Sequence, residues 1–252
     1  MEKYFTINEE KRSIRCKIIS DDPAGADDIV IFGHGFGGHK DNRAAARLAG
    51  RLIAKNRRSA LIAFDWPCHG EDARKNLTLN DCTDYLRLVT AHARDRFHAK
   101  RLYGCATSFG GYLYLKAIGD GFDPFEKTAL RCPAVNMYEA LTTNILTDDD
   151  RAKLQKGKPV SAGFDRKVTI GPSFIEELKQ NDITKTDYLE SAEKLLILHG
   201  TKDEIISFEA SRRFADDNLI EFVPVPNADH RFSDPNIMDQ AINTIIHFYG
   251  LK

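Results

Sequence analysis

Residues 101–116 read RLYGCATSFGGYLYLK and decide the fold class of this 252-residue chain. A short apolar run leads directly into a helix-like run over residues 110–118, and Ser108 lies between the two. A turn this tight between a strand and a helix strains the backbone of its central residue and pushes the side chain out of the sheet. Ala106 and Gly110 are small, as such a turn requires, because a bulkier side chain would collide with a neighbouring element. The stretch therefore predicts a nucleophilic serine at the end of a strand.

The rest of the chain alternates short apolar strands with helices. We expect strands at 4–8, 14–20, 28–32, 60–64, 101–105, 128–135, 194–199 and 220–225. We expect helices at about 42–55, 81–97, 110–118, 208–216 and 237–249. Nearly all-apolar strands that alternate with helices predict an α/β fold with an eight-stranded, mostly parallel sheet and helices on both faces. The first two strands are close enough in sequence to form an antiparallel hairpin at one edge.

Between residues 136 and 191 this alternation stops. The segment is polar, with an acidic run at 148–150, an expected hairpin around 160–170 and a short expected helix near 174–180. We interpret it as a cap insertion over the carboxyl ends of the strands, where open α/β sheets place their active sites. The chain is thus predicted to be a single domain, residues 1–252, with a cap at about 136–191.

The composition limits the classes of binding partner and the cellular compartment that we expect for this chain. Lys and Arg total 36 and Asp and Glu total 37, so the net charge of −1 favours neither nucleic acid nor a membrane surface as a partner. No run approaches the roughly 18 apolar residues of a membrane span, and no signal peptide is visible. We expect a cytoplasmic protein with free thiols and with no metal or cofactor, since the cysteines are odd in number and form no CxxC pair. A homodimer is compatible with the sequence. The five cysteines are Cys16, Cys68, Cys82, Cys105 and Cys132.

One motif favours a different class of enzyme. Residues 33–38, GHGFGG, match the dinucleotide-binding pattern GxGxxG, and Asp65 ends the next expected strand. Tyr112 and Lys116 form a Tyr-x-x-x-Lys pair that resembles the catalytic pair of short-chain dehydrogenases, so an NAD(P)-dependent oxidoreductase is an alternative. Against it, the glycine loop follows the third expected strand, and Asp65 lies 27 residues beyond the last glycine, against the usual distance of about 20. Ser108 also lies only four residues before Tyr112, which does not match the dehydrogenase order.

A serine hydroxyl becomes a nucleophile only with a base beside it and an acid that orients the base. After a serine on such a turn, the expected chain order is Asp or Glu and then His. Residues 199–206, HGTKDEII, place Asp203 just after the most apolar strand, and residues 226–232, PNADHRF, place His230 after the last strand. We therefore predict a triad of Ser108, Asp203 and His230. Other carboxylates that we consider for the acid are Glu204, Asp229 and Asp182.

The tetrahedral intermediate of such a reaction needs N–H donors for its oxyanion. The backbone N–H of Phe109, directly after the serine, is at a helix N-terminus whose dipole favours negative charge. The second donor is expected in the glycine loop, at the backbone N–H of Phe36, so the glycines serve an oxyanion rather than a phosphate. His34 and His69 are expected to be structural.

These motifs together resemble the α/β-hydrolase superfamily over nearly the whole chain: HGFGG, ATSFGG, HGTKD and ADHRFSD. Within it the chain is similar to bacterial cinnamoyl/feruloyl esterases and to serine-aminopeptidase-like hydrolases, through the ADHxFSD ending and the cap. The resemblance implies a serine carboxylesterase that cleaves a small-molecule ester, with a hydroxycinnamoyl (feruloyl-type) or other small acyl group. A non-catalytic ligand-binding protein on the same fold is an alternative. Two departures are Ala106 in place of the usual glycine and the loop at 65–72, DWPCHGED, which borders the family's pocket. Candidate contacts for the acyl group, with packing within the cap as the alternative, are Asn136, Tyr138 and Asn144.

Overall fold

The computed structural model describes residues 1–9, 12–72, 74–163 and 166–251, and it is built around one eight-stranded sheet. The strand order is β1-β2-β4-β3-β5-β6-β9-β10, in which β1 and β2 form an antiparallel edge and β3 to β10 run parallel. Every residue of β3, β4 and β9 is buried, which explains their unbroken apolar sequences. The strands span Glu2–Glu9, Arg12–Ser20, Asp28–Gly33, Ser59–Phe64, Arg101–Thr107, Lys127–Arg131, Leu195–Gly200 and Glu221–Val225.

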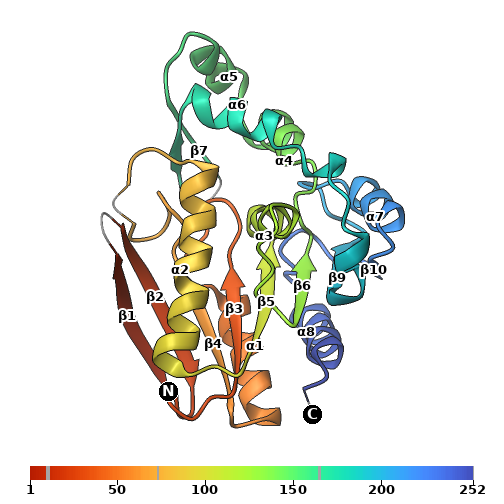
Figure 1. Ribbon diagram of the computed structural model, residues 1–252. Helices are drawn as coiled ribbons and strands as arrows, with labels where there is room; N and C mark the ends of the chain where they lie inside the picture. Colours follow the sequence, from red (N-terminus) through yellow and green to blue (C-terminus); the bar gives the residue numbers. More distant parts are fainter. Residues whose placement is uncertain (10–11, 73, 164–165, 252) are drawn as a thin grey trace.

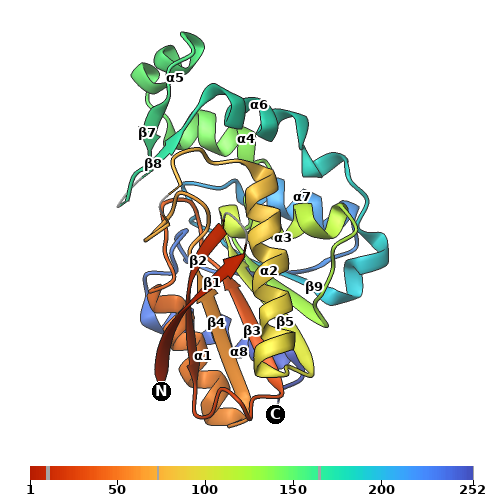
Figure 2. The same cartoon turned by 60° about the vertical axis from the view of Figure 1, so that its left-hand side comes forward.

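Helices cover both faces of the sheet and divide the core into two clusters (Figures 1 and 2). Helices α1 and α8 pack on one face, while α2, α3 and α7 pack on the other. The N-cap of α1 is Asn42, whose side chain accepts hydrogen bonds from the amides of Ala44 and Ala45. The five helices span Arg43–Lys55, Leu79–Phe97, Phe109–Gly119, Phe208–Asp217 and Pro235–Tyr249.

The segment between β6 and β9 forms a cap at the carboxyl ends of the parallel strands. In Figure 1, α4, α5 and α6 lie above the arrowheads of β3 and β5, beyond the end of the sheet. The cap also contains a two-stranded hairpin, β7 and β8, and the carbonyl of Arg166, just before β8, lies against Gly37 of the glycine loop after β3. Its elements are α4 Met137–Glu139, a π-helix η1 Ala140–Ile145, α5 Asp148–Gln155, β7 Val160–Ala162, β8 Val168–Ile170, α6 Pro172–Gln180 and the 3₁₀ turns η2 Ile183–Lys185 and η3 Leu189–Lys194.

One predicted strand is too long, and one helix was not predicted. The strand expected at 128–135 ends at Arg131, because Cys132 has a φ of 45° and the next residue, Pro133, has no N–H for a ladder. The acidic run at 148–150, to which the sequence analysis assigned no secondary structure, forms the first turn of α5. Thr147 caps that helix in a reciprocal capping box with Asp150, and negative charge in a first turn is favoured by the helix dipole.

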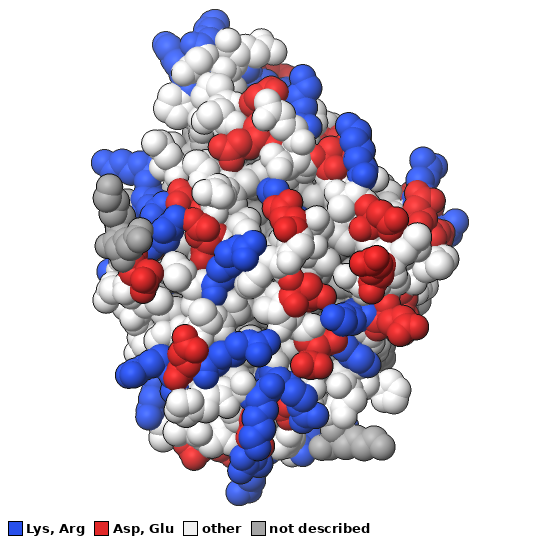
Figure 3. Space-filling view, in the orientation of Figure 1, with Lys and Arg blue, Asp and Glu red and all other residues white. Residues whose placement is uncertain are grey.

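The surface carries both signs of charge. Figure 3 shows basic and acidic side chains interspersed over the face that Figure 1 presents. Within the described residues, no helix combines the length and the apolar character that crossing a bilayer requires.

Candidate active site

Ser108 lies on a strained turn between β5 and α3. Its φ and ψ are 53° and −121°, a region that costs a non-glycine residue about 1–3 kcal/mol. The turn is held by backbone hydrogen bonds, since the Ser108 N–H donates to the carbonyl of Arg131 at 3.1 Å and the Ser108 carbonyl accepts from Ala134 at 3.1 Å. A Cβ on Gly110 would lie 2.5 Å from the carbonyl oxygen of Gly33, so only glycine allows this close approach of α3 to β3.

Asp203 and His230 form a hydrogen-bonded pair, and His230 lines the same cavity as Ser108. The Nδ1 of His230 donates to Oδ2 of Asp203 at 2.7 Å, which leaves Nε2 of the ring available to a hydroxyl. Asp203 is fully buried, whereas the side chain of His230 is 14% exposed, so the pair presents only the imidazole to solvent. The three loops that follow β5, β9 and β10 thus bring the predicted serine, acid and base to one end of the sheet.

A second histidine, which the sequence analysis did not assign, also contacts the acid. His199, the penultimate residue of β9, is fully buried and places Nε2 3.2 Å from Oδ2 of Asp203 and 3.3 Å from the carbonyl of Ile206. Both partners are acceptors, so Nε2 carries the hydrogen. The available signal was its position four residues before Asp203 in the HGTKD motif.

The other oxygen of Asp203 is held by the backbone. Oδ1 accepts hydrogen bonds from the amides of Ile205 and Ile206, both at 2.9 Å. Burial by itself would raise the pKa of this carboxyl, but the hydrogen bonds from His199 and His230 outweigh it and hold the pKa well below its ordinary value. Asp203 is therefore ionised whenever His230 can act as a base. The alternative acids Asp229 and Asp182 are used in their own turns, where they accept from Ser233 and Thr184 respectively.

The two expected oxyanion donors flank the serine. A Cβ placed on Gly35 would lie 3.1 Å from the Cβ of Ser108 and 3.7 Å from its Oγ, so the glycine loop passes directly beside the nucleophile. Among the described residues, the backbone N–H of Phe36 donates no hydrogen bond, and that of Phe109 donates none outside α3. Both are therefore open to an oxyanion. The Phe36 and Phe109 rings pack edge-to-face with centroids 5.8 Å apart, which fixes the two segments relative to each other.

These groups open onto a cavity of about 850 Å³. Ser108 and His230 lie on its wall, with the glycine loop on one side and the start of α1 on another. The expected substrate contacts Asn136, Tyr138 and Asn144 do not line it. Asn136 donates to Glu139, Asn144 donates to the carbonyl of Ile205, and Tyr138 is 40% exposed.

The histidines of the neighbouring loops are structural. His34 is fully buried, with Nδ1 2.8 Å from the carbonyl of Gly35 and Nε2 accepting from the Trp66 amide at 3.3 Å. His69 is also buried and places Nδ1 2.8 Å from the carbonyl of Pro67. Burial lowers the pKa of His69 to about 4 and that of His34 well below its usual value, so both rings are neutral.

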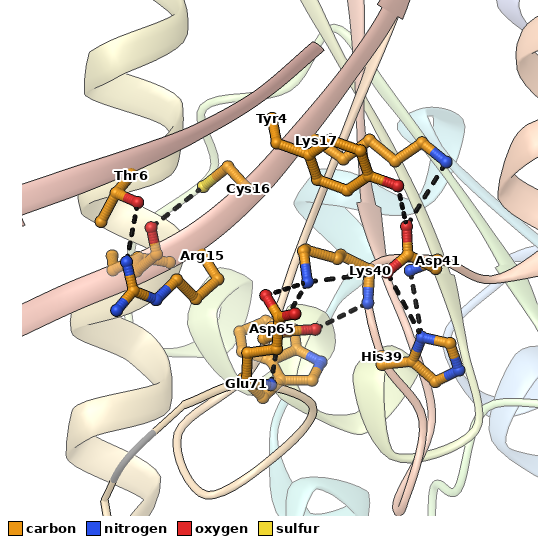
Figure 4. Close-up of polar contacts among 12 residues, drawn as sticks. Tyr4, Thr6, Arg15, Cys16, Lys17, His39, Lys40, Asp41, Asp65 and Glu71 are labelled. Carbon is orange, nitrogen blue, oxygen red and sulfur yellow. Dashed lines mark hydrogen bonds and ion pairs between the residues drawn. The ribbon is translucent and has the colours of Figure 1, made fainter. Parts of the chain in front are cut away.

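The residues that favoured a dehydrogenase serve other purposes. Asp65 is fully buried and accepts from the amides of Lys40 and Glu71, so its carboxylate is not available to a ribose (Figure 4). Tyr112 donates to the carbonyl of Asn181, and the Lys116 ammonium pairs with Asp120. The tyrosine and lysine therefore do not act together.

Within the described part of the chain, one group of side chains has the spacing of a metal site. It consists of Cys132, Asp203 and His230, whose ligand atoms lie within 4.8 Å of one another. Two of the three already form the acid–base pair. Burial raises the pKa of the Cys132 thiol well above its usual value, so the third is a neutral, poor ligand.

Comparison with known proteins identifies the family. The alpha/beta hydrolase family model matches residues 29–243, so this chain belongs to the α/β hydrolase family. A search of curated proteins gives no match. The sheet order, the serine on its turn and the acid and base on later loops follow the arrangement expected for this family.

Solved structures of similar fold include esterases and a lipase. Est1E from Butyrivibrio proteoclasticus, solved with ferulic acid bound, is 17% identical with a TM-score of 0.75, over 98% of this chain and 99% of that one. The esterase Pf2001 from Pyrococcus furiosus is 16% identical with a TM-score of 0.73, and the match covers 99% of this chain and 92% of that one. A monoglyceride lipase variant from Saccharomyces cerevisiae is 14% identical with a TM-score of 0.74, and the match covers 99% of this chain and 96% of that one. At these identities the likeness is one of fold.

Proposed function

We propose that this protein hydrolyses carboxylic esters through an acyl-enzyme on Ser108. The observation that supports the proposal most strongly is the 2.7 Å hydrogen bond from His230 to the buried Asp203, on the wall of the cavity that also exposes the strained Ser108. A serine on this turn with an oriented imidazole beside it is the arrangement that nucleophilic acyl transfer requires.

The proposed reaction has two halves. His230 accepts the Ser108 proton as the hydroxyl attacks the ester carbonyl, while the amides of Phe36 and Phe109 stabilise the oxyanion. The imidazolium then protonates the leaving alcohol, and a water molecule, activated by the same imidazole, releases the acid. Asp203 remains ionised throughout and stabilises the imidazolium.

The acyl group that we propose is small. Est1E, which shares the fold, was solved with ferulic acid, so hydroxycinnamoyl esters are the first aromatic class to test. Short aliphatic acyl groups are the second class, since aliphatic side chains, Ile145, Ile205 and Met238, also line the cavity.

Purified protein is expected to hydrolyse p-nitrophenyl acetate and butyrate, and Ser108→Ala is expected to lose at least ~10³-fold in kcat. Methyl ferulate in the same assay measures the aromatic preference. Equal turnover by the wild type and Ser108→Ala would refute the proposed mechanism. Circular dichroism of the variant serves as the folding control.

A further inference from the structure

The wall of the active-site cavity carries an excess of positive charge. Its arginines come from α1, β6, the β7–β8 connection and the loop after His230, and the described lining contains one carboxylate, that of Asp41. This differs from the face shown in Figure 3, where both signs are interspersed. The arginines are Arg43, Arg47, Arg131, Arg166 and Arg231. Arg47 and Arg231 have interactions of their own and do not count toward the unmatched charge.

Asp41 does not balance these arginines, because its carboxylate is already paired with other groups. It accepts from the hydroxyl of Tyr4 at 2.7 Å and lies 3.4 Å from Nζ of Lys17 and 3.6 Å from Nζ of Lys40 (Figure 4). Two lysines therefore lie beside this one carboxylate and balance its charge.

Arg131 lies next to the nucleophile in the fold. It ends β6 opposite Thr107, and its carbonyl accepts the Ser108 N–H. Its Nε and Nη2 both donate hydrogen bonds to the hydroxyl oxygen of Thr107, at 3.2 and 3.1 Å. Its Nη1 faces only weak acceptors, the carbonyl of Arg231 at 3.5 Å and the sulfur of Met238 at 3.4 Å.

No carboxylate of the described residues lies within ion-pair distance of Arg131. Asp203 and Asp229 are near enough to act on it electrostatically, but the oxygens of Asp203 are hydrogen-bonded to histidines and amides, and Asp229 accepts from its own turn. Burial lowers the pKa of Arg131, and it outweighs the opposing effect of the nearby Asp203 and Asp229 carboxylates. The guanidinium also lies over the Phe232 ring, 5.3 Å from its centroid, so its partners are neutral groups. A partly buried cation without an anionic partner is costly, so a counter-ion is expected from the ligand.

Two further cations line the same cavity and form no ion pair with a carboxylate of the described residues. Arg43 begins α1, whose positive helix end borders the cavity, and Arg166 lies on the β7–β8 connection with its carbonyl against Gly37. Arg47, by contrast, is paired with Asp239 at 2.6 Å. The unmatched charge is thus spread from Arg131, next to the serine, to the mouth of the cavity.

We propose that the ester hydrolysed at Ser108 also carries a carboxylate, which Nη1 of Arg131 binds, with Arg166 and Arg43 attracting the anion to the cavity. The inference rests on the proposed ester hydrolysis and narrows its substrate class to half-esters of dicarboxylic acids and related acidic esters. A carboxylate matches the planar guanidinium and replaces the two weak acceptors of Nη1 with a charge-assisted bond.

The test compares mono-p-nitrophenyl adipate, which carries a free carboxylate, with its methyl ester, which has the same acyl length and no charge. Wild-type protein is expected to favour the anionic substrate in kcat/KM by about 10- to 100-fold, the effect of one charge-assisted hydrogen bond. Arg131→Gln is expected to remove most of this preference, and Arg131→Lys to retain part of it. Arg57→Gln, an exposed arginine that does not line the cavity, is the matched control and should keep the wild-type preference.

A second readout does not depend on the folding of an Arg131 variant. In wild-type protein, added NaCl should lower kcat/KM for the anionic ester and leave the neutral ester unchanged, and Arg166→Gln should weaken that salt dependence. Equal kcat/KM for the two esters, with no salt effect, would overturn the inference and leave the proposed ester hydrolysis standing. Failure to hydrolyse either ester would instead refute the proposed function, and the inference with it.

Discussion

Asp203 makes more polar contacts than either of the other two predicted triad residues. Its two oxygens accept four hydrogen bonds, from His230, His199 and the amides of Ile205 and Ile206. A buried carboxylate with this many donors stays ionised and cannot rotate. The imidazole of His230 is therefore held in one tautomer and one orientation before any substrate binds.

His199 is predicted to act as a positioning residue for this acid. His199→Phe removes the Nε2 donor and should lower kcat about 10-fold with little change in KM, because a lost hydrogen bond of roughly 1.4 kcal/mol affects the acid rather than ester binding. His199→Gln, whose amide nitrogen can reach the same place, should recover part of the rate. A purely structural role would instead lower the thermal midpoint of both variants and leave kcat unchanged.

At the scale of elements, the close contact between α3 and β3 sets the position of the nucleophile. Gly110→Ala would bring a Cβ to 2.5 Å from the carbonyl oxygen of Gly33 and 2.7 Å from that of His34, both backbone atoms that cannot turn away. We expect a loss of about 2–3 kcal/mol in the free energy of unfolding, together with a lower kcat.

Gly50→Ala is the matched control for this prediction. Gly50 lies inside α1, and a Cβ there would meet no atom within 4 Å. It should stabilise the protein by about 0.5–1 kcal/mol, because alanine is the better helix former. Urea denaturation measures both changes, and similar values for the two variants would contradict the packing described here.

The sequence allows the sheet, the flanking helices and the elbow to be predicted because each depends on local patterns. Unbroken apolar runs specify β3, β4 and β9, and the small residues around Ser108 specify the turn. Helix α5 was not predicted, although Thr147 and Asp150 have the spacing of a capping box at its start. The end of β6 was not predicted either, since it depends on the positive φ of Cys132.

The groups that the sequence could not assign are those defined by tertiary contacts. Arg131 is a single charged residue after an apolar strand, and its significance lies in the absence of a carboxylate beside it among the described residues. The contact of His199 with Asp203 depends on how the loop after β9 folds back on the strand. The proposed acyl contacts in the cap depended on side-chain directions that sequence spacing does not give.

At the scale of the whole molecule, buried histidines link stability to pH. The pKa of His69 is lowered to about 4 by burial, against 6.5 for an exposed imidazole. Between these values the unfolded chain binds a proton that the folded state does not, so stability falls as the pH falls from 6.5 to 4. The loss from this residue is about 3 kcal/mol, complete below pH 4, and His34 adds to it in the same direction.

His69→Asn should therefore reduce the acid sensitivity of the thermal midpoint, since its amide nitrogen can still donate to the carbonyl of Pro67. The quantity to compare is the difference between the midpoints at pH 7 and pH 4.5, which should be smaller in the variant than in the wild type. His247→Asn, an exposed residue of α8, should leave the difference unchanged. An equal difference in all three proteins would show that His69 is not buried in its neutral form.

The central claim is that Ser108 is the nucleophile, activated by His230 and Asp203. The most direct measurement is reaction with a fluorophosphonate, followed by intact mass and peptide mapping. We predict one label per chain, on Ser108, absent in Ser108→Ala and at least ~100-fold slower in His230→Ala. A label on another residue, or none on folded wild-type protein, would contradict the account.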